Sequence, residues 1–212
     1  MRTRIKICGL RTLEAVQTCV QSGADAVGFV FYGPSPRAVT PPEARPLAIA
    51  LGPWITPVAL FVNPTVMEVK AVLDVIPNAL LQFHGDESPA FCTQFAQPFM
   101  KAIRMKEGVD LRSELDVFHL AQGVLLDSWS EHFGGSGHTF DWSLLSEVSG
   151  CGMPLILSGG LSDGNVADAI KQVKPYGVDV SSGVESHRGV KSTEKIMSFC
   201  KAVHVADTRS LV

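Results

Sequence analysis

The sequence has no surplus of either charge and no run of like charges. It has 18 Lys and Arg residues against 21 Asp and Glu residues in 212, a formal net charge of −3 at pH 7. A surface of this balance provides no broad electrostatic attraction to nucleic acid or to an anionic membrane. It leaves room for a small, locally positive site that binds a phosphate. We therefore expect a small-molecule partner and neither a nucleic-acid nor a membrane partner.

Long apolar runs and cysteine motifs are also missing. No uninterrupted stretch of about 18 apolar residues occurs, so no transmembrane helix is expected, and the first residues lack the apolar segment of a secretory signal. The five cysteines are odd in number and widely spaced, with neither C-x-x-C nor a zinc-binding Cys/His spacing. We expect a reduced, cytoplasmic protein without disulfides and without a metal site.

Short apolar runs rich in β-branched residues recur along the whole chain. They start roughly 20–30 residues apart, as expected for β-strands that alternate with helices. The eight runs lie at 5–9, 26–31, 56–62, 80–85, 99–105, 123–128, 154–160 and 177–183.

Segments of helical character fill most of the intervals between these runs. They lie at 12–23, 41–52, 64–77, 88–96, 141–150, 162–175 and 192–205. Pro46 makes the segment at 41–52 irregular, and the segment at 110–120 is short.

Alternating strands and helices predict an α/β fold with a parallel sheet and helices outside it. Eight strands favour a closed (β/α)8 TIM barrel over an open doubly wound sheet, which has fewer strands as a rule. No break in composition divides the chain. We expect one domain over residues 1–212, with a tail after about residue 204 that is free to fray.

Polar side chains occupy the inner phase of several predicted strands near their C-terminal ends. Because side chains alternate along a strand, Lys6 and Cys8 should face the barrel interior while Ile5 and Ile7 face the helices. The same phase holds Gln82, His84, Asp127, Asp179 and Ser181. Active sites of this fold lie at the C-terminal ends of the strands, so these residues predict a site there.

Each of these residues taken singly also has a plain structural interpretation. Cys8 fits a small buried apolar residue, and His84 fits a loop histidine whose ring is hydrogen-bonded. Asp127 fits a cap for the loop that follows it. Asp179 fits a structural partner for Lys6, since an unpaired buried lysine is costly.

Two glycine-bearing turns predict a phosphate site. One follows the seventh strand at Gly159 and Gly160, and the other follows the eighth at Ser181, Ser182 and Gly183. Loops after strands seven and eight form a recurrent phosphate site in this fold, because glycines allow close approach to backbone N–H groups. The pair of turns implies a phosphorylated small molecule.

Two further loops are candidates for contact with a ligand. Arg37, in the loop after the second strand, is either a solvated charge or a bidentate clamp for a substrate carboxylate. The glycine-rich loop at 129–140 is long enough for a lid, and a plain surface loop fits it nearly as well.

Seven motifs in order along the chain resemble those of phosphoribosylanthranilate isomerase. They are KICGL at 6–10, ADAVGFVFYGPSPR at 24–37, QFHGDE at 82–87, LLDS at 125–128, GGSGHTFDW at 134–142, LSGGL at 157–161 and DVSSGVE at 179–185. The resemblance extends from residue 4 to about residue 200. It implies a (β/α)8 barrel that catalyses an Amadori rearrangement in tryptophan biosynthesis without a cofactor.

The resemblance also implies roles for individual residues. Cys8 is the expected general base, Asp127 the general acid, and Arg37 the group that binds the anthranilate carboxylate. The two glycine-bearing turns resemble the family's phosphate site. From their inner phase, His84 and Asp179 are also expected at the substrate, although His84 could instead only shape the mouth of the pocket. Because only a thiolate can act as the base, we expect positive groups near Cys8 that favour the anion.

Two alternative functions share much of this pattern. An aldose–ketose isomerase of histidine biosynthesis uses the same phosphate loops, but its family has an aspartate where this chain has Cys8. A barrel that binds phosphosugars without catalysis is the second alternative.

The chain is expected to be a monomer or a homodimer, and Trp54 and Trp129 could lie at a dimer interface or at the rim of the site.

Overall fold

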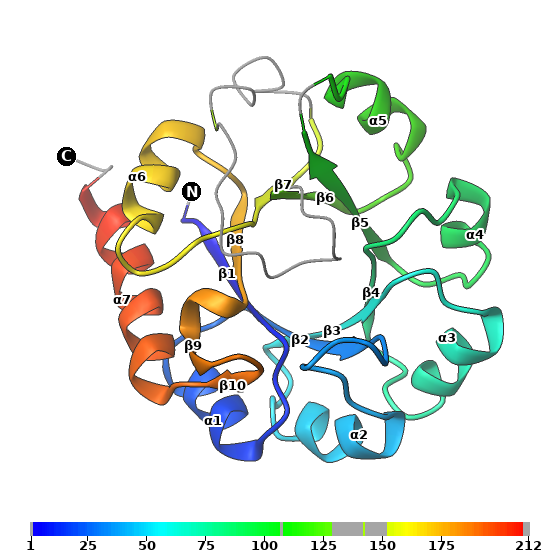
Figure 1. The fold of residues 1–212 in the computed structure, drawn as a ribbon, viewed down its shortest axis with the longest axis horizontal. Coiled ribbons are helices and arrows are strands. Elements are labelled where there is room, and N and C mark those ends of the chain that lie inside the picture. The colour runs from blue at the N-terminus through cyan, green and yellow to red at the C-terminus, as the bar shows by residue number, and fades with distance from the viewer. Residues whose placement is uncertain (1, 107, 129–141, 143–151, 210–212) are drawn as a thin grey trace.

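A computed structural model describes residues 2–106, 108–128, 142 and 152–209. Eight parallel strands form a closed barrel in the order β1 to β8, confirming the predicted TIM barrel (Figure 1). The strands are β1 (Arg4–Cys8), β2 (Ala26–Phe31), β3 (Thr56–Phe61), β4 (Leu80–Phe83), β5 (Phe99–Met105), β6 (Gly123–Ser128), β7 (Leu155–Leu157) and β8 (Gly177–Val180).

Helices surround the barrel on its outer side, as Figure 1 shows in a view along the barrel. They are α1 (Leu13–Gln21), α2 (Pro41–Ile49), α3 (Val66–Leu73), α4 (Pro89–Thr93), α5 (Leu111–Val117), α6 (Val166–Val173) and α7 (Thr193–Arg209). The predicted helix at 141–150 lies outside the described residues, apart from Trp142. The predicted irregularity at Pro46 does not interrupt α2.

Local sequence signals fix where the helices begin. Thr65 is the N-cap of α3, where its hydroxyl accepts a hydrogen bond from the backbone N–H of Glu68, and the Glu68 carboxylate accepts one from the N–H of Thr65. This reciprocal capping satisfies two N–H groups that a helix start leaves without partners. Thr12, Ser88 and Asp110 cap α1, α4 and α5 with one side-chain bond each.

Alternation along the strands separates an outer apolar layer from the barrel interior. Ile5 and Ile7 of β1 are fully buried in the large cluster between strands and helices. The interior holds two smaller apolar clusters, one around Val58 and Met100 and one around Cys8. The predicted phase of β1 is therefore confirmed: Cys8 and Lys6 face inward.

The barrel closes where β1 pairs with β8, and there Lys6 lies opposite Asp179 in the strand register. The two ends of the chain reinforce this seam. Thr3 donates hydrogen bonds to the Asp207 carboxylate from its backbone N–H and its hydroxyl, both at 2.8 Å. The last helix thus remains ordered to Arg209, and Asp207 in it holds the start of β1.

A small antiparallel hairpin, which the sequence analysis did not predict, follows β8. A short 3-10 helix, η2 (Ser182–Val184), leads into β9 (Glu185–His187), which pairs with β10 (Val190–Lys191). Figure 1 shows the hairpin between α7 and the end of β1. It therefore lies next to the mouth of the barrel.

Gly183 is required by close packing. A Cβ atom built on Gly183 would lie 1.9 Å from the carbonyl oxygen of Leu161, whereas one on Gly164 would meet nothing closer than the Ser162 hydroxyl at 3.7 Å. The turn after β8 can therefore lie against the turn after β7 only if residue 183 has no side chain.

Gly183→Ala should lower the free energy of unfolding by about 3 kcal/mol, at the upper end of the cost of overpacking. Gly164→Ala is the matched control and should change it by less than about 1 kcal/mol. Urea unfolding followed by circular dichroism measures both. Equal stability of the two variants would contradict the proposed packing.

Candidate active site

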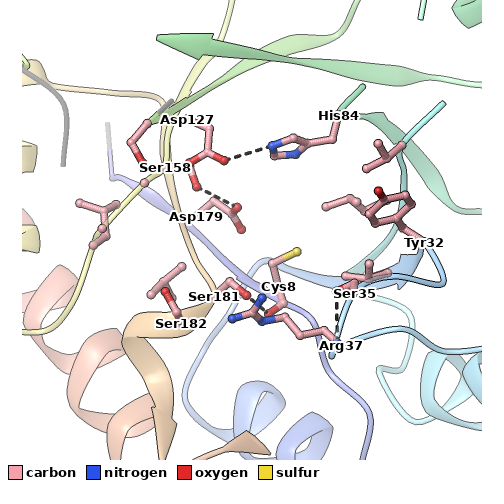
Figure 2. A pocket seen from close by; sticks show the side chains of 18 residues that line it. Cys8, Tyr32, Ser35, Arg37, His84, Asp127, Ser158, Asp179, Ser181 and Ser182 are labelled. Carbon is pink, nitrogen blue, oxygen red and sulfur yellow. Dashed lines mark hydrogen bonds and ion pairs between the residues drawn. The ribbon is translucent and has the colours of Figure 1, made fainter. Parts of the chain in front are cut away.

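A pocket opens at the C-terminal ends of the strands, where the sequence placed the site. Of the described residues predicted at the site, all line it except Lys6, Gln82 and Gly183, and Gly183 is packed on Leu161. Figure 2 shows the side chains of Cys8, His84, Asp127 and Asp179 directed into the same hollow, with Arg37 below them. The predicted loop at 129–140, with Trp129, and the fifth cysteine, Cys151, lie outside the described residues.

Lys6 and Asp179 form a buried ion pair beneath the pocket. The Lys6 ammonium donates to Asp179 Oδ1 at 2.8 Å, and the Ser158 hydroxyl donates to Asp179 Oδ2 at 3.2 Å. Burial alone would lower the pKa of Lys6, but attraction to Asp179 and Cys8 outweighs it and raises that pKa. Lys6 is therefore a fixed positive charge, and its predicted pairing with Asp179 is confirmed.

Cys8 lies in an apolar corner of the pocket, two residues after Lys6. Its side chain packs with Val30, Leu60 and Val62, and Gly28 on the neighbouring strand leaves room for its sulfur: a Cβ there would lie 2.7 Å from Sγ. Burial raises the pKa of the thiol, while the charges of Lys6 and Lys191 act against it without cancelling it. The expected positive groups are present and favour the thiolate, although burial outweighs them.

Asp127 is the next-to-last residue of β6 and the last member of a buried hydrogen-bonded chain. Its Oδ2 lies 3.1 Å from His84 Nε2, and His84 Nδ1 lies 3.1 Å from Gln82 Nε2. A histidine between an amide and a carboxyl group has a fixed ring orientation. The carboxyl group of Asp127 is thereby held toward the pocket rather than free to rotate.

The loop that carries His84 is held from below by a second buried ion pair. Lys101 donates to Glu87 Oε2 at 3.0 Å and to the carbonyl of Gly85 at 2.6 Å. Glu87 in turn accepts the backbone N–H groups of Gly85 and Asn63. Neither Lys101 nor Glu87 was singled out from the sequence, although Lys101 lies within one predicted strand and Glu87 follows another.

Arg37 reaches the pocket from the loop after β2 and forms a bidentate pair with Glu185 of β9. Arg37 Nε donates to Glu185 Oε1 at 2.6 Å and Nη2 donates to Oε2 at 3.0 Å. Lys191 of β10 donates to the same carboxylate at 2.9 Å. Burial opposes the charge of Glu185, but Arg37, Lys191 and the N–H of Gly189 lower its pKa to about 2. Glu185 is therefore ionised at neutral pH and fixes the guanidinium of Arg37.

Residues of both predicted glycine-bearing turns also line the pocket. Gly159 and Gly160 have positive φ angles of 85° and 65°, a backbone conformation that favours glycine. The side chain of Asn165 ties this turn by donating to the carbonyl of Gly160 at 2.9 Å. Ser181 and Ser182 line the pocket beside it. Backbone N–H groups in such turns suit an anion.

The chemistry available in this pocket is that of an acid and a base at fixed positions. A thiol and a carboxyl group share the pocket, and positive charge lies behind the thiol. No group of three or more metal-ligating side chains occurs within the part of the chain that the structure describes. No helix among these residues is long and apolar enough to cross a membrane.

The chain is similar to known proteins over nearly its whole length. Residues 5–202 match the sequence profile of the family described as N-(5'phosphoribosyl)anthranilate (PRA) isomerase. The isomerase of Methylibium petroleiphilum is 51% identical over 209 residues, covering 99% of this chain and 97% of its own, and that of Dechloromonas aromatica is 47% identical with 98% and 99% covered.

Solved structures give the same result. The crystal structure of phosphoribosyl anthranilate isomerase from Thermotoga maritima superimposes with a TM-score of 0.89 at 38% identity, covering 96% of this chain and 99% of that one. A structure of such an isomerase in complex with reduced 1-(o-carboxyphenylamino)-1-deoxyribulose 5-phosphate gives a TM-score of 0.85 at 36% identity, with the same coverage. The chain therefore belongs to the N-(5′-phosphoribosyl)anthranilate isomerase family.

Proposed function

We propose that this chain isomerises N-(5′-phosphoribosyl)anthranilate in tryptophan biosynthesis, with Cys8 as general base and Asp127 as general acid. The product is 1-(2-carboxyphenylamino)-1-deoxyribulose 5-phosphate. The observation that carries the assignment of roles is the convergence of the Cys8 thiol and the Asp127 carboxyl group in a pocket that Arg37 and the two glycine-bearing turns also line.

The first step needs an acid. Protonated Asp127 gives its proton to the furanose ring oxygen, the bond from that oxygen to C1 breaks, and the nitrogen lone pair forms a C1=N double bond. Because His84 holds Asp127 Oδ2 at 3.1 Å, the proton is delivered from a fixed position. His84 then acts at the substrate indirectly, through Asp127.

The second step needs a base. The Cys8 thiolate removes the proton from C2, and the C2–H electron pair moves to form an enolamine as the C1=N double bond becomes a single bond. The enolamine tautomerises to the C2 ketone as C1 gains a proton, so the rearrangement requires no external oxidant or reductant. Burial makes the thiolate scarcer, and it also makes each thiolate a stronger base.

Binding of the substrate uses the two ends of the pocket. We assign the anthranilate carboxylate to Arg37, whose guanidinium retains N–H groups beyond the two that Glu185 accepts. We assign the phosphate to the backbone of Gly159 and Gly160 and to the turn at Ser181 and Ser182. Asp179 lines the pocket, and we assign it the task of holding Lys6 and Ser158 in place.

Two further features bear on the oligomeric state and the cellular location of the protein. Trp54 is 92% exposed and borders a hollow at the N-terminal face of the barrel, and a Thermotoga maritima relative is described as dimeric. Of the two expected states, these features favour a homodimer. A free catalytic thiol at Cys8 suits the reducing conditions of the cytoplasm.

Fluorescence of the anthranilate group tests the function directly. Adding the protein to freshly made phosphoribosylanthranilate should change the emission as the ring-opened product forms. No change with a folded sample would favour a barrel that only binds phosphosugars. Turnover of the aldose intermediate of histidine biosynthesis in place of this substrate would favour the other isomerase.

Cys8→Ala and Asp127→Asn should each lower kcat/KM by about 10²–10⁴-fold, because each removes a group that transfers a proton. Cys92→Ala is the matched control, since Cys92 is also a buried thiol but lies away from the pocket. Steady-state assays on folded variants give the result. Near-full activity of either site variant would remove that residue from its assigned role.

Arg37→Met should raise the KM for phosphoribosylanthranilate by about 10- to 100-fold, because a charge-assisted contact is lost. We expect a much smaller change in kcat, since Arg37 contacts the substrate far from C1 and C2. Arg2→Met removes another arginine that pairs with a carboxylate, Asp25, remote from the site, and should leave KM unchanged. Loss of kcat alone in Arg37→Met would be inconsistent with a binding role.

A further inference from the structure

Lys191 is a buried cation that the mechanism above does not use. Its side chain is 3% exposed, although it lies on a strand of only two residues in the β9–β10 hairpin. Its ammonium donates to the carbonyl of Ser181 at 2.8 Å, to the Ser181 hydroxyl at 3.3 Å and to Glu185 Oε1 at 2.9 Å. All of its hydrogen bonds thus go to residues that adjoin the pocket.

The charges around Lys191 do not balance. Arg37 and Lys191 share the carboxylate of Glu185, so among the residues that the structure describes this cluster carries one surplus positive charge. Lys6 and Asp179 form a pair with no net charge. Uncompensated charge is costly to bury, and burial does lower the pKa of Lys191. A surplus positive charge beside the pocket would stabilise an anion within it.

Lys191 is also connected to Cys8 through Ser181. The Ser181 hydroxyl donates to the backbone carbonyl of Cys8 at 3.1 Å. Three charged groups act on the thiol: Lys6 from β1, Asp179 from β8 and Lys191 from β10. The side chains on β2 and β3 that pack against it, Val30 and Leu60, are apolar. Because Asp179 offsets part of the effect of Lys6, Lys191 matters as a second cation that favours the thiolate.

We propose that Lys191 is a positioning residue for the isomerisation. Its charge favours the thiolate of Cys8, and its bond to Glu185 holds the carboxylate that orients Arg37. One residue of the hairpin would then support both the base and the carboxylate clamp. This inference rests on the proposed function for its catalytic meaning, but its effect on the thiol can be measured without turnover.

The test compares the alkylation of Cys8 by iodoacetamide across pH in four proteins. These are the wild type, Lys191→Gln, Lys191→Arg and the control Lys195→Gln. Lys195 lies in the first turn of α7 and donates to the main-chain carbonyl of Glu185, at 2.6 Å, rather than to its carboxylate. Trypsin releases Cys8 in the peptide ICGLR, residues 7–11, so mass spectrometry follows this thiol separately from the other four cysteines.

Lys191→Gln should alkylate about 3- to 30-fold more slowly than the wild type at a pH below the thiol's pKa, since one nearby positive charge is lost. Its pH profile should move to higher pH, and its KM for phosphoribosylanthranilate should rise. Lys191→Arg should restore most of the alkylation rate because it keeps the charge. Lys195→Gln should match the wild type.

Superimposable alkylation profiles of folded Lys191→Gln and the wild type would overturn the proposal. If Lys191→Gln does not fold, Lys191→Met serves as the second uncharged variant, and failure of both to fold would assign Lys191 to stability alone. Altered alkylation in a protein that does not turn over phosphoribosylanthranilate would instead refute the proposed function and leave the effect of Lys191 on the thiol intact.

Discussion

Lys6 and Asp179 face each other across the seam where the first and last strands of the barrel pair, and both are buried. An ion pair in such an interior has to form, because either partner left alone would be an uncompensated charge. The pair fixes the phase of β1 and thereby turns Cys8 into the pocket. Through Ser158 it also reaches the turn after β7. Cys8, the proposed base, and the turn proposed to bind the phosphate are therefore positioned by the same contact that closes the barrel.

Two sets of hydrogen bonds and ion pairs hold the other side chains of the site. On one side His84 and Gln82 hold Asp127, and the pair of Lys101 and Glu87 fixes the loop beneath them. On the other side the β9–β10 hairpin brings Glu185 and Lys191 to Arg37. Each reactive group thus has an ionic or hydrogen-bonded support of its own, as preorganised acid–base catalysis requires. The net positive charge of the hairpin side suits a substrate that carries a carboxylate and a phosphate.

Much of this arrangement could be predicted from the sequence, because it depends on the alternation of side chains along a strand and on the spacing of the strands. Alternation in IKIC places Lys6 and Cys8 inside the barrel, and eight evenly spaced runs give the strands. The partner of Arg37 could not be predicted in this way, since Glu185 is 148 positions away and joins it only through a hairpin of two very short strands. The state of the Cys8 thiol also escaped prediction, because it depends on how burial competes with two lysines and one aspartate.

The proposed reaction requires one geometry above all. A single bound sugar phosphate must span the pocket with its reacting carbons between Cys8 and Asp127. A crystal structure of this protein with the reduced rearrangement product tests it directly. We expect the carboxylate of the ligand at Arg37 and its phosphate at the turns around Gly159–Gly160 and Ser181–Ser182. We expect C2 of the ligand within reach of Cys8 Sγ. A ligand bound with its phosphate at Arg37, or with Cys8 remote from C2, would contradict it.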